Sequence, residues 1–259
     1  MIRLKTQSQI DVIAAAGAIV AEVLDLAAAT ALPGVTTGDL DEAAEDRIRS
    51  HPGATPAFKG LYGFPAAVCT SVNDEVVHGI PSHERRLEEG DIVTVDVGVR
   101  LDGLFADAAL TIPVGRVTNE TRRLLDVTRG ALDIGVASAR PGDRLGDLGA
   151  AIQDHVESAG YSVIRELVGH GVGEAPHEEP QVPNFGVPGR GARMEPGLVI
   201  AIEPMVNQGD RAVRTLDDEW TVVTADGSLS AHFEHTVAVT ADGPMVLTTA
   251  PSHTPAGES

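Results

Sequence analysis

Two hydrophobic periodicities alternate along the chain. In four segments apolar residues recur at every third or fourth position, with polar residues between them, which is typical of amphipathic helices. These segments predict helices over about 13–32, 39–50, 121–139 and 147–158. Elsewhere, short runs of β-branched and apolar residues bounded by glycine or proline predict strands. We therefore expect an α+β fold in which each pair of helices is followed by strands.

The helical and strand segments form an internal repeat. The stretch 33–40 shares five of eight residues with the stretch 141–148, at an offset of 108. The stretch 90–96 matches 197–203 at an offset of 107, because in both a glycine opens an apolar run that ends in a carboxylate. Two matches at nearly the same offset predict two related helix–helix–strand halves. Since ligands arise from both, we expect a site at their junction.

We expect one domain to hold both halves. The halves would span about 8–112 and 118–240, within a single catalytic domain over residues 1–249. The polar segment 250–259 is expected to be a disordered tail. A length of 259 residues with 42% hydrophobic residues is ample for one large core or two small ones.

Residues 91–112 predict a β-hairpin. Two apolar runs flank Asp102-Gly103, a dipeptide that favours a two-residue hairpin turn. In the register that this turn sets, Asp96 and Asp107 project from the same face as diagonal neighbours, roughly 7–8 Å apart at the backbone. Their carboxylates are then close enough to share a metal ion, unless a bulge interrupts either strand.

Five potential metal ligands fall at the ends of predicted strands, in short apolar runs where a polar side chain is costly without a partner. These residues are Asp96, Asp107, His170, Glu203 and Glu234. Exposed carboxylates on a solvated strand face are the alternative, but the apolar surroundings favour burial. Carboxylates with one imidazole suit a pair of hard-to-borderline divalent ions, which activate water and polarise carbonyl groups. The pattern therefore predicts metal-assisted hydrolysis.

Charge and cysteine content narrow the classes of partner. The chain has 38 acidic and 19 basic residues, a net charge of −19. So acidic a surface argues against binding nucleic acid or an anionic membrane through a basic patch. The single cysteine, Cys69, excludes an internal disulfide and a thiolate-rich zinc site.

The N-terminal segment superficially resembles a signal peptide. Two basic residues precede the apolar run 12–21, but Asp11 interrupts its start, and Glu22 and Asp25 precede any plausible cleavage site. The helical spacing of its apolar residues favours a packed amphipathic helix. We expect a cytoplasmic protein, with no apolar segment long enough to span a membrane.

Seven short motifs, in the same order along the chain, resemble those of the type I methionine aminopeptidases. They are Cys69–Asn73, Val77–Pro81, Asp91–Gly98, Gly169–Gly173, His177–Pro180, Ile202–Val206 and Phe233–Thr236. Each motif alone is weak, but the set is specific and covers nearly the whole chain apart from the tail. The resemblance implies the "pita-bread" fold, in which two pseudo-symmetric halves surround a curved antiparallel sheet.

The resemblance also implies roles for the five ligands. Two divalent metal ions are expected, and cobalt, manganese, iron and zinc all tolerate such ligands. Asp96 would bind one ion, Asp107 and Glu234 would bridge the pair, and His170 and Glu203 would complete the other. Glu203 would also act as general base and later as general acid.

The resemblance implies further residues that contact the substrate. His78 and His177 would contact the peptide and stabilise the tetrahedral intermediate. Cys69, Phe64 and Trp220 would line an apolar pocket for the methionine side chain. From the residues alone, the two aromatic residues would be ordinary core, and Cys69 a small buried apolar residue.

The expected function is removal of the initiator methionine from nascent polypeptides whose second residue is small. We expect a monomer that acts on nascent N-termini, and any transient ribosome contact would involve the catalytic domain. One alternative is an aminopeptidase for Xaa-Pro bonds, which shares the fold and ligands but usually carries an extra N-terminal domain. Another is a non-enzymatic peptide-binding module of the same fold, although such modules characteristically lose metal ligands and all five candidates are present here.

Overall fold

The computed structural model describes residues 2–249, so the expected disordered tail at 250–259 lies outside the described residues. The four predicted helices are confirmed, and a 3₁₀ helix, η1, covers Leu61–Gly63. The α-helices are α1 (Gln7–Thr30), α2 (Thr37–Arg49), α3 (Asn119–Ser138) and α4 (Leu145–Ser158).

Helix α1 begins six residues before its predicted start. The side chain of Thr6 accepts a hydrogen bond from the backbone N–H of Gln9, and the side chain of Gln9 accepts one from the N–H of Thr6. This capping box satisfies two backbone donors that would otherwise be free at the helix N-terminus. The pair Thr6 and Gln9 was the sequence signal for the earlier start.

Fifteen short or long strands pair with one another in antiparallel fashion within residues 2–249. The expected antiparallel sheet is built from four hydrogen-bonded groups, in the orders β1-β4-β2 with β5 on β4, β15-β14-β9-β7-β8, β13-β10-β6 and β11-β12-β3. The strands are β1 (Thr55–Pro56), β2 (Val68–Val72), β3 (Glu75–Val77), β4 (Ile92–Leu101), β5 (Leu104–Pro113), β6 (Ser162–Val163), β7 (Gly169–Gly171), β8 (Glu178–Val182), β9 (Val199–Ile202), β10 (Met205–Asn207), β11 (Val213–Thr215), β12 (Val222–Thr224), β13 (Ser230–His232), β14 (His235–Thr240) and β15 (Gly243–Val246).

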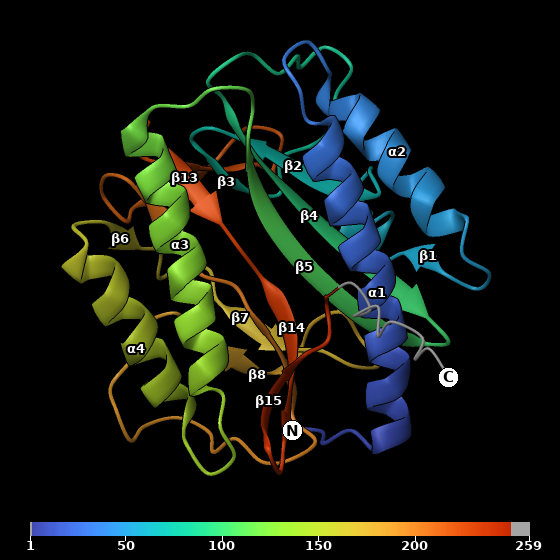
Figure 1. Cartoon of the computed structure of the whole chain (residues 1–259), viewed down its shortest axis with the longest axis vertical. Coiled ribbons are helices and arrows are strands. Elements are labelled where there is room, and N and C mark those ends of the chain that lie inside the picture. Colours follow the sequence, from blue (N-terminus) through green and yellow to red (C-terminus); the bar gives the residue numbers. More distant parts are fainter. Residues whose placement is uncertain (1, 250–259) are drawn as a thin grey trace, which may run out of the picture.

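The helices lie in two pairs on either side of the long strands. Figure 1 shows α1 and α2 on one side, α3 and α4 on the other, and β4, β5 and β14 running between them. Helix α1 packs on β4 and β5 and contributes Ile13 and Val20 to the first hydrophobic core. Helices α3 and α4 pack on each other around a second core that includes Leu132 and Ile152. We call the part of the chain from α1 to β5 the first lobe and the part from α3 to β15 the second lobe.

Helix α1 corrects one expectation from the sequence. It is long and apolar enough to cross a bilayer by length and composition, so the expectation that no segment reaches that length was wrong. Half of its most apolar stretch is buried inside the fold, however. Ile13, Ala16 and Val20 are fully buried against the first core, because a core helix needs an apolar face just as a spanning helix does.

The two lobes repeat the same turn. Gly34 and Gly142 have φ angles of 96° and 97°, a left-handed conformation that favours glycine. The N–H of Gly34 donates to the carbonyl oxygen of Leu87 over 2.8 Å, and that of Gly142 donates to the carbonyl of Met194 over 2.8 Å. These pairs stand at offsets of 108 and 107, as do the two similar stretches of sequence.

The predicted hairpin is confirmed. Asp102 and Gly103 form its turn with φ angles of 47° and 83°, and both signs are those of a type I′ turn. Leu101 pairs with Leu104, and the ladder continues without a bulge through ten residue pairs. Strand β4 lies between β5 on one side and β1 and β2 on the other, so it is central and buried, as its two apolar faces predict.

The register of the hairpin places two of the candidate ligands. Asp96 pairs with Ala109, and Asp107 pairs with Gly98, as the turn predicts. Both carboxylates therefore lie on one face as diagonal neighbours. The expectation that they end their strands was wrong: they lie in the middle of β4 and β5, because both strands continue to the turn.

A seam of hydrogen bonds joins the lobes where residues 107–111 of β5 face residues 232–236. At its centre the N–H of Glu234 donates to the carbonyl of Ala109 over 3.0 Å. On each side a threonine hydroxyl accepts from a backbone N–H and donates to the carbonyl of the same residue. Thr236 bridges Asp107 in this way, at 3.1 and 2.8 Å, and Thr111 bridges His232, at 2.8 and 2.8 Å.

Candidate metal centre and substrate pocket

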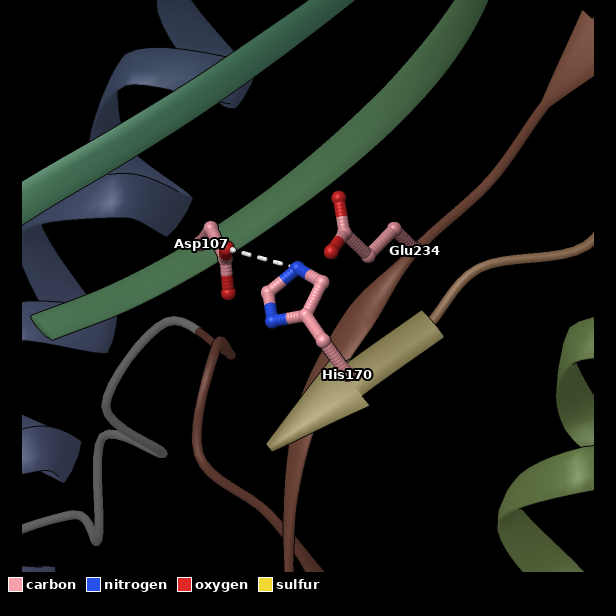
Figure 2. Close-up of side chains that lie close together, drawn as sticks. All are labelled: Asp107, His170 and Glu234. Atoms are coloured by element: carbon pink, nitrogen blue, oxygen red, sulfur yellow. Dashed lines mark ion pairs between the residues drawn. The ribbon is translucent and has the colours of Figure 1, made fainter. Parts of the chain in front are cut away.

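The structure brings the five candidate ligands together at the junction of the lobes. Two come from the hairpin and three from the second lobe, where His170 lies on β7, Glu203 follows β9, and Glu234 lies between β13 and β14. Figure 2 shows Asp107, His170 and Glu234 pointing toward one another. One ligand atom from each of these three lies within 4.8 Å of the others, as one bound ion requires.

The protonation of His170 follows from its hydrogen bond. Its Nδ1 lies 3.0 Å from the carbonyl oxygen of Gly171, and since a carbonyl only accepts, Nδ1 carries the proton. In the neutral ring, Nε2 then carries a lone pair. This nitrogen lies 3.6 Å from Asp107 Oδ2 and 3.5 Å from Glu203 Oε1. Three electron-rich atoms facing one another favour a cation between them.

The buried carboxylates also lack positively charged partners. Burial, and then the negative charges of neighbouring carboxylates, raise the pKa values of Asp96, Glu203 and Glu234 well above the ordinary range. Asp96 Oδ1 is buried without a hydrogen-bond partner. Among the described residues, the lining of the surrounding cavity includes no lysine or arginine to neutralise them. The residues present therefore fit divalent metal ions, whose charge would compensate this excess.

Thr236 holds one ligand in place. Its side chain is fully buried, and its one hydroxyl proton is shared between the carbonyl oxygen of Asp107, 2.8 Å away, and Asp107 Oδ1, 2.9 Å away. The carboxylate is therefore oriented from the opposite lobe. Contacts of this kind fix the direction in which a metal ligand points.

His232 is a residue of the site that sequence reasoning missed. It is buried, and neither ring nitrogen has a hydrogen-bond partner within the described part of the chain. Nε2 lies 3.9 Å from Glu203 Oε2 and 4.0 Å from Glu234 Oε2. Burial, with a smaller contribution from the charge of His78, lowers its pKa to about 3, so the ring is neutral. Its position two residues before Glu234 was the only signal in the sequence.

His78 and His177 both line the same cavity. The ring of His177 lies edge-on to that of His170, with centroids 4.4 Å apart. His78 has a φ of 60°, an uncommon conformation for a residue with a side chain and one often found at functional sites. Burial lowers the pKa of both imidazoles, so both are neutral hydrogen-bond donors at neutral pH.

Part of the wall of the cavity is apolar. The whole cavity has a volume of about 630 Å³, and its lining includes Cys69, Phe64 and Trp220 as well as all five candidate ligands. Phe64 and Trp220 meet edge to face, with ring centroids 5.1 Å apart. Phe58 and Met205 also line it and were not expected from the sequence. An apolar side chain can thus lie beside the charged cluster.

Comparison with known proteins places the chain in a known family. Residues 11–241 match the model of the metallopeptidase family M24. The chain is 52% identical over 249 residues to the methionine aminopeptidase of Clostridium perfringens, an alignment that covers 96% of this chain and 99% of the relative.

Solved structures show the same fold. The methionine aminopeptidase of Thermotoga maritima superposes with a TM-score of 0.94 at 46% identity, covering 96% of this chain and 100% of that one. Prolidase from Pyrococcus furiosus shares the fold alone, with a TM-score of 0.78 at 23% identity over 95% of this chain and 65% of that one.

Proposed function

The chain belongs to the metallopeptidase family M24, and we propose that it removes the initiator methionine from nascent proteins whose second residue is small. The resemblance found in the sequence is confirmed by relatives that match over nearly their whole length. The observation that carries the proposal is the cavity, in which a cluster of metal ligands adjoins an apolar pocket. Such a cavity suits an unbranched apolar side chain next to the bond that is hydrolysed.

The enzyme uses divalent metal, and we propose two ions. Asp96 would bind one ion, Asp107 and Glu234 would bridge the pair, and His170 and Glu203 would complete the other. When bound, such ions activate water and polarise the carbonyl group of the substrate. Manganese, iron, cobalt and zinc are all compatible with these ligands, so the supply of metal in the cell would decide between them.

The chain's own residues would perform the proton transfers. Glu203 lines the cavity beside the other candidate ligands, where its carboxylate would accept a proton from water and return it to the leaving amine. His78 and His177 are neutral, so each can donate a hydrogen bond to the peptide carbonyl oxygen as negative charge develops on it.

The proposed metal centre would also favour a free amino terminus. The amino group of the substrate would complete the metal coordination, which a peptide bond in mid-chain cannot do. The apolar pocket formed by Phe64, Cys69 and Trp220 would receive the methionine side chain. We propose that the reaction takes place in the cytoplasm, on nascent chains, by a monomer, and that any ribosome contact is transient.

Two other functions can be distinguished from the proposed one. An Xaa-Pro peptidase shares the fold, but the chain covers only 65% of the Pyrococcus furiosus prolidase at 23% identity, against 100% of the Thermotoga maritima enzyme at 46%. A non-catalytic peptide-binding module would not need its ligand cluster, yet one ligand atom each from Asp107, His170 and Glu234 lies within 4.8 Å of the others. Neither alternative is favoured.

Peptide hydrolysis by metal-reconstituted protein tests the proposal. We expect release of methionine from Met-Ala-Ser only, with no release from Met-Leu-Ser and no cleavage of Ala-Pro-Ala. Glu203→Ala should abolish release while circular dichroism shows that the fold is retained. Preferential cleavage of Ala-Pro-Ala would overturn the substrate assignment, and full activity of Glu203→Ala would remove this residue from the mechanism.

A further inference from the structure

A buried ion pair outside the metal centre joins the chain's N-terminal segment to the loop that carries His177. We call residues 3–5 the N-terminal strap and residues 173–178 the histidine loop. Lys5 Nζ donates to Glu178 Oε2 over 2.6 Å and to the carbonyl oxygen of Arg3 over 3.0 Å. The side chains of Lys5 and Glu178 are only 4% and 11% exposed, although the two residues lie 173 positions apart.

Glu178 organises the histidine loop with its other oxygen. Oε1 accepts hydrogen bonds from the backbone N–H of Glu174 over 2.7 Å and from that of Ala175 over 3.1 Å. The same loop is tied to the first lobe, because the N–H of Phe105 donates to the carbonyl of Gly173 over 3.0 Å. Lys5 therefore neutralises the one carboxylate that caps this loop.

The strap has little room to move. A methyl group on Gly173 would overlap Lys5 Cε and lie 2.8 Å from Glu178 Oε1. On its other side the N–H of Lys5 donates to the carbonyl of Gly197 over 2.6 Å, and a methyl group on Gly197 would lie 2.8 Å from the carbonyl oxygen of Lys5. The two glycines thus hold the lysine in a narrow slot that points its ammonium group at Glu178.

His177 directly precedes Glu178, which is the first residue of β8. The loop's anchor and its functional side chain are therefore set by the same stretch of backbone. We propose that Lys5 is a positioning residue, which acts through Glu178 to hold the His177 ring beside His170 and toward the substrate. The proposal rests on the proposed function for the role of His177.

Because the Lys5–Glu178 ion pair is buried, the position of the histidine loop depends strongly on both partners. Removing one partner of a buried ion pair leaves the other charge buried and uncompensated, which the structure relieves by moving. In Lys5→Met the Glu178 carboxylate would turn to water and release the two N–H groups that it caps. A second ion pair links the same strap and loop, between Arg3 and Glu174 over 2.8 Å, but its side chains are 66% and 57% exposed. Exposed pairs of this kind contribute little.

The exposed pair provides a matched control. In manganese-loaded protein we expect Lys5→Met to lower kcat for Met-Ala-Ser about tenfold with KM changed by no more than about twofold, because His177 acts mainly in the transition state. Lys5→Arg should restore most of kcat, and Arg3→Met should leave it unchanged. Manganese affinity, measured by calorimetry, should stay the same in all three variants. Amide hydrogen exchange within 173–178 should become faster in Lys5→Met alone.

Several outcomes would overturn the proposal. Wild-type kcat in Lys5→Met would do so, as would a parallel loss of manganese affinity, which would show that the lysine acts through the metal ligands or the whole fold. If Lys5→Met does not fold, Glu178→Gln decides, since glutamine keeps a side-chain oxygen that can accept from the backbone N–H groups but removes the charge. Unchanged kcat and unchanged hydrogen exchange in Glu178→Gln would contradict the role of the ion pair. If the wild type does not release methionine, the proposed function fails, and exchange within 173–178 still tests the strap.

Discussion

At the scale of single residues, Thr236 is an uncharged side chain that contacts a proposed metal ligand. It belongs to the second lobe, yet its hydroxyl lies 2.9 Å from the carboxylate of Asp107, which belongs to the first. Replacing it with valine keeps the volume but removes the contact with the carboxylate together with the two hydrogen bonds to the backbone of Asp107. We expect Thr236→Val to weaken manganese binding about 10- to 100-fold, as loss of such orienting contacts does elsewhere.

Calorimetric titration of metal-free protein with manganese measures this effect, and Thr236→Ser is the matched control because it keeps the hydroxyl. Thr236→Ser should bind manganese nearly as tightly as the wild type. Equal affinity in the valine variant would show that the hydrogen bond does not orient Asp107.

The raised pKa values of Asp96, Glu203 and Glu234 predict that metal binding releases protons. In the metal-free protein these groups hold protons above the ordinary carboxyl range, and bound cations displace them. Affinity should therefore rise with pH until the raised pKa values are passed. His232, whose pKa is lowered to about 3, is neutral with or without metal and contributes no proton.

Calorimetry at one pH in buffers with different ionisation enthalpies counts these protons. We expect a positive number at low pH that becomes smaller as the pH is raised. No proton release at the lower pH would mean that the carboxylates are already ionised without metal, and that burial does not raise their pKa values as inferred here.

The sequence predicts residues of the site when local pattern carries the information. Asp96 and Asp107 were placed together by the turn dipeptide between them, because a hairpin converts a short sequence into a register. His232 and Lys5 were not found, since their importance arises from partners that only the folded chain brings close. A lysine near the N-terminus carries no sign of a glutamate 173 residues away.

At the scale of elements, the hairpin of β4 and β5 determines where the first-lobe ligands lie, and its turn depends on Gly103. This residue has a φ of 83°, and a methyl group added to it would meet no atom within 4 Å. The cost of Gly103→Ala is therefore conformational, and we expect a loss of about 1 kcal/mol in the free energy of unfolding.

Urea denaturation of metal-free protein measures that loss. Ala109→Gly, in the same hairpin but within β5, is a useful comparison because it weakens a strand instead of the turn. A Gly103→Ala variant as stable as the wild type would show that the turn relaxes to another geometry without cost.

Long periodic elements were predictable and short ones were not. The four helices were found because each presents several turns of apolar spacing, and their starts were missed where caps such as Thr6 precede that spacing. Strands of two or three residues, such as β6 and β7, are too short for any period to show. Their positions are set by tertiary hydrogen bonds, so His170 on β7 was recognised by its motif and not by its strand.

At the scale of the whole molecule, neither lobe contains a complete site. Asp96 and Asp107 belong to the first lobe, and the other three ligands belong to the second. The seam between residues 107–111 and 232–236 fixes the distance between the two sets. We therefore expect that neither half alone forms the proposed site, since that site draws side chains from both sides of the seam.

The central claim is that these five side chains bind two metal ions together. Anomalous diffraction at the manganese edge, from crystals grown with manganese, tests it most directly. We predict two anomalous peaks about 3.5–4 Å apart, surrounded by the carboxylate oxygens of the four acidic residues and by Nε2 of His170. A single peak, or peaks outside this cluster, would contradict the account.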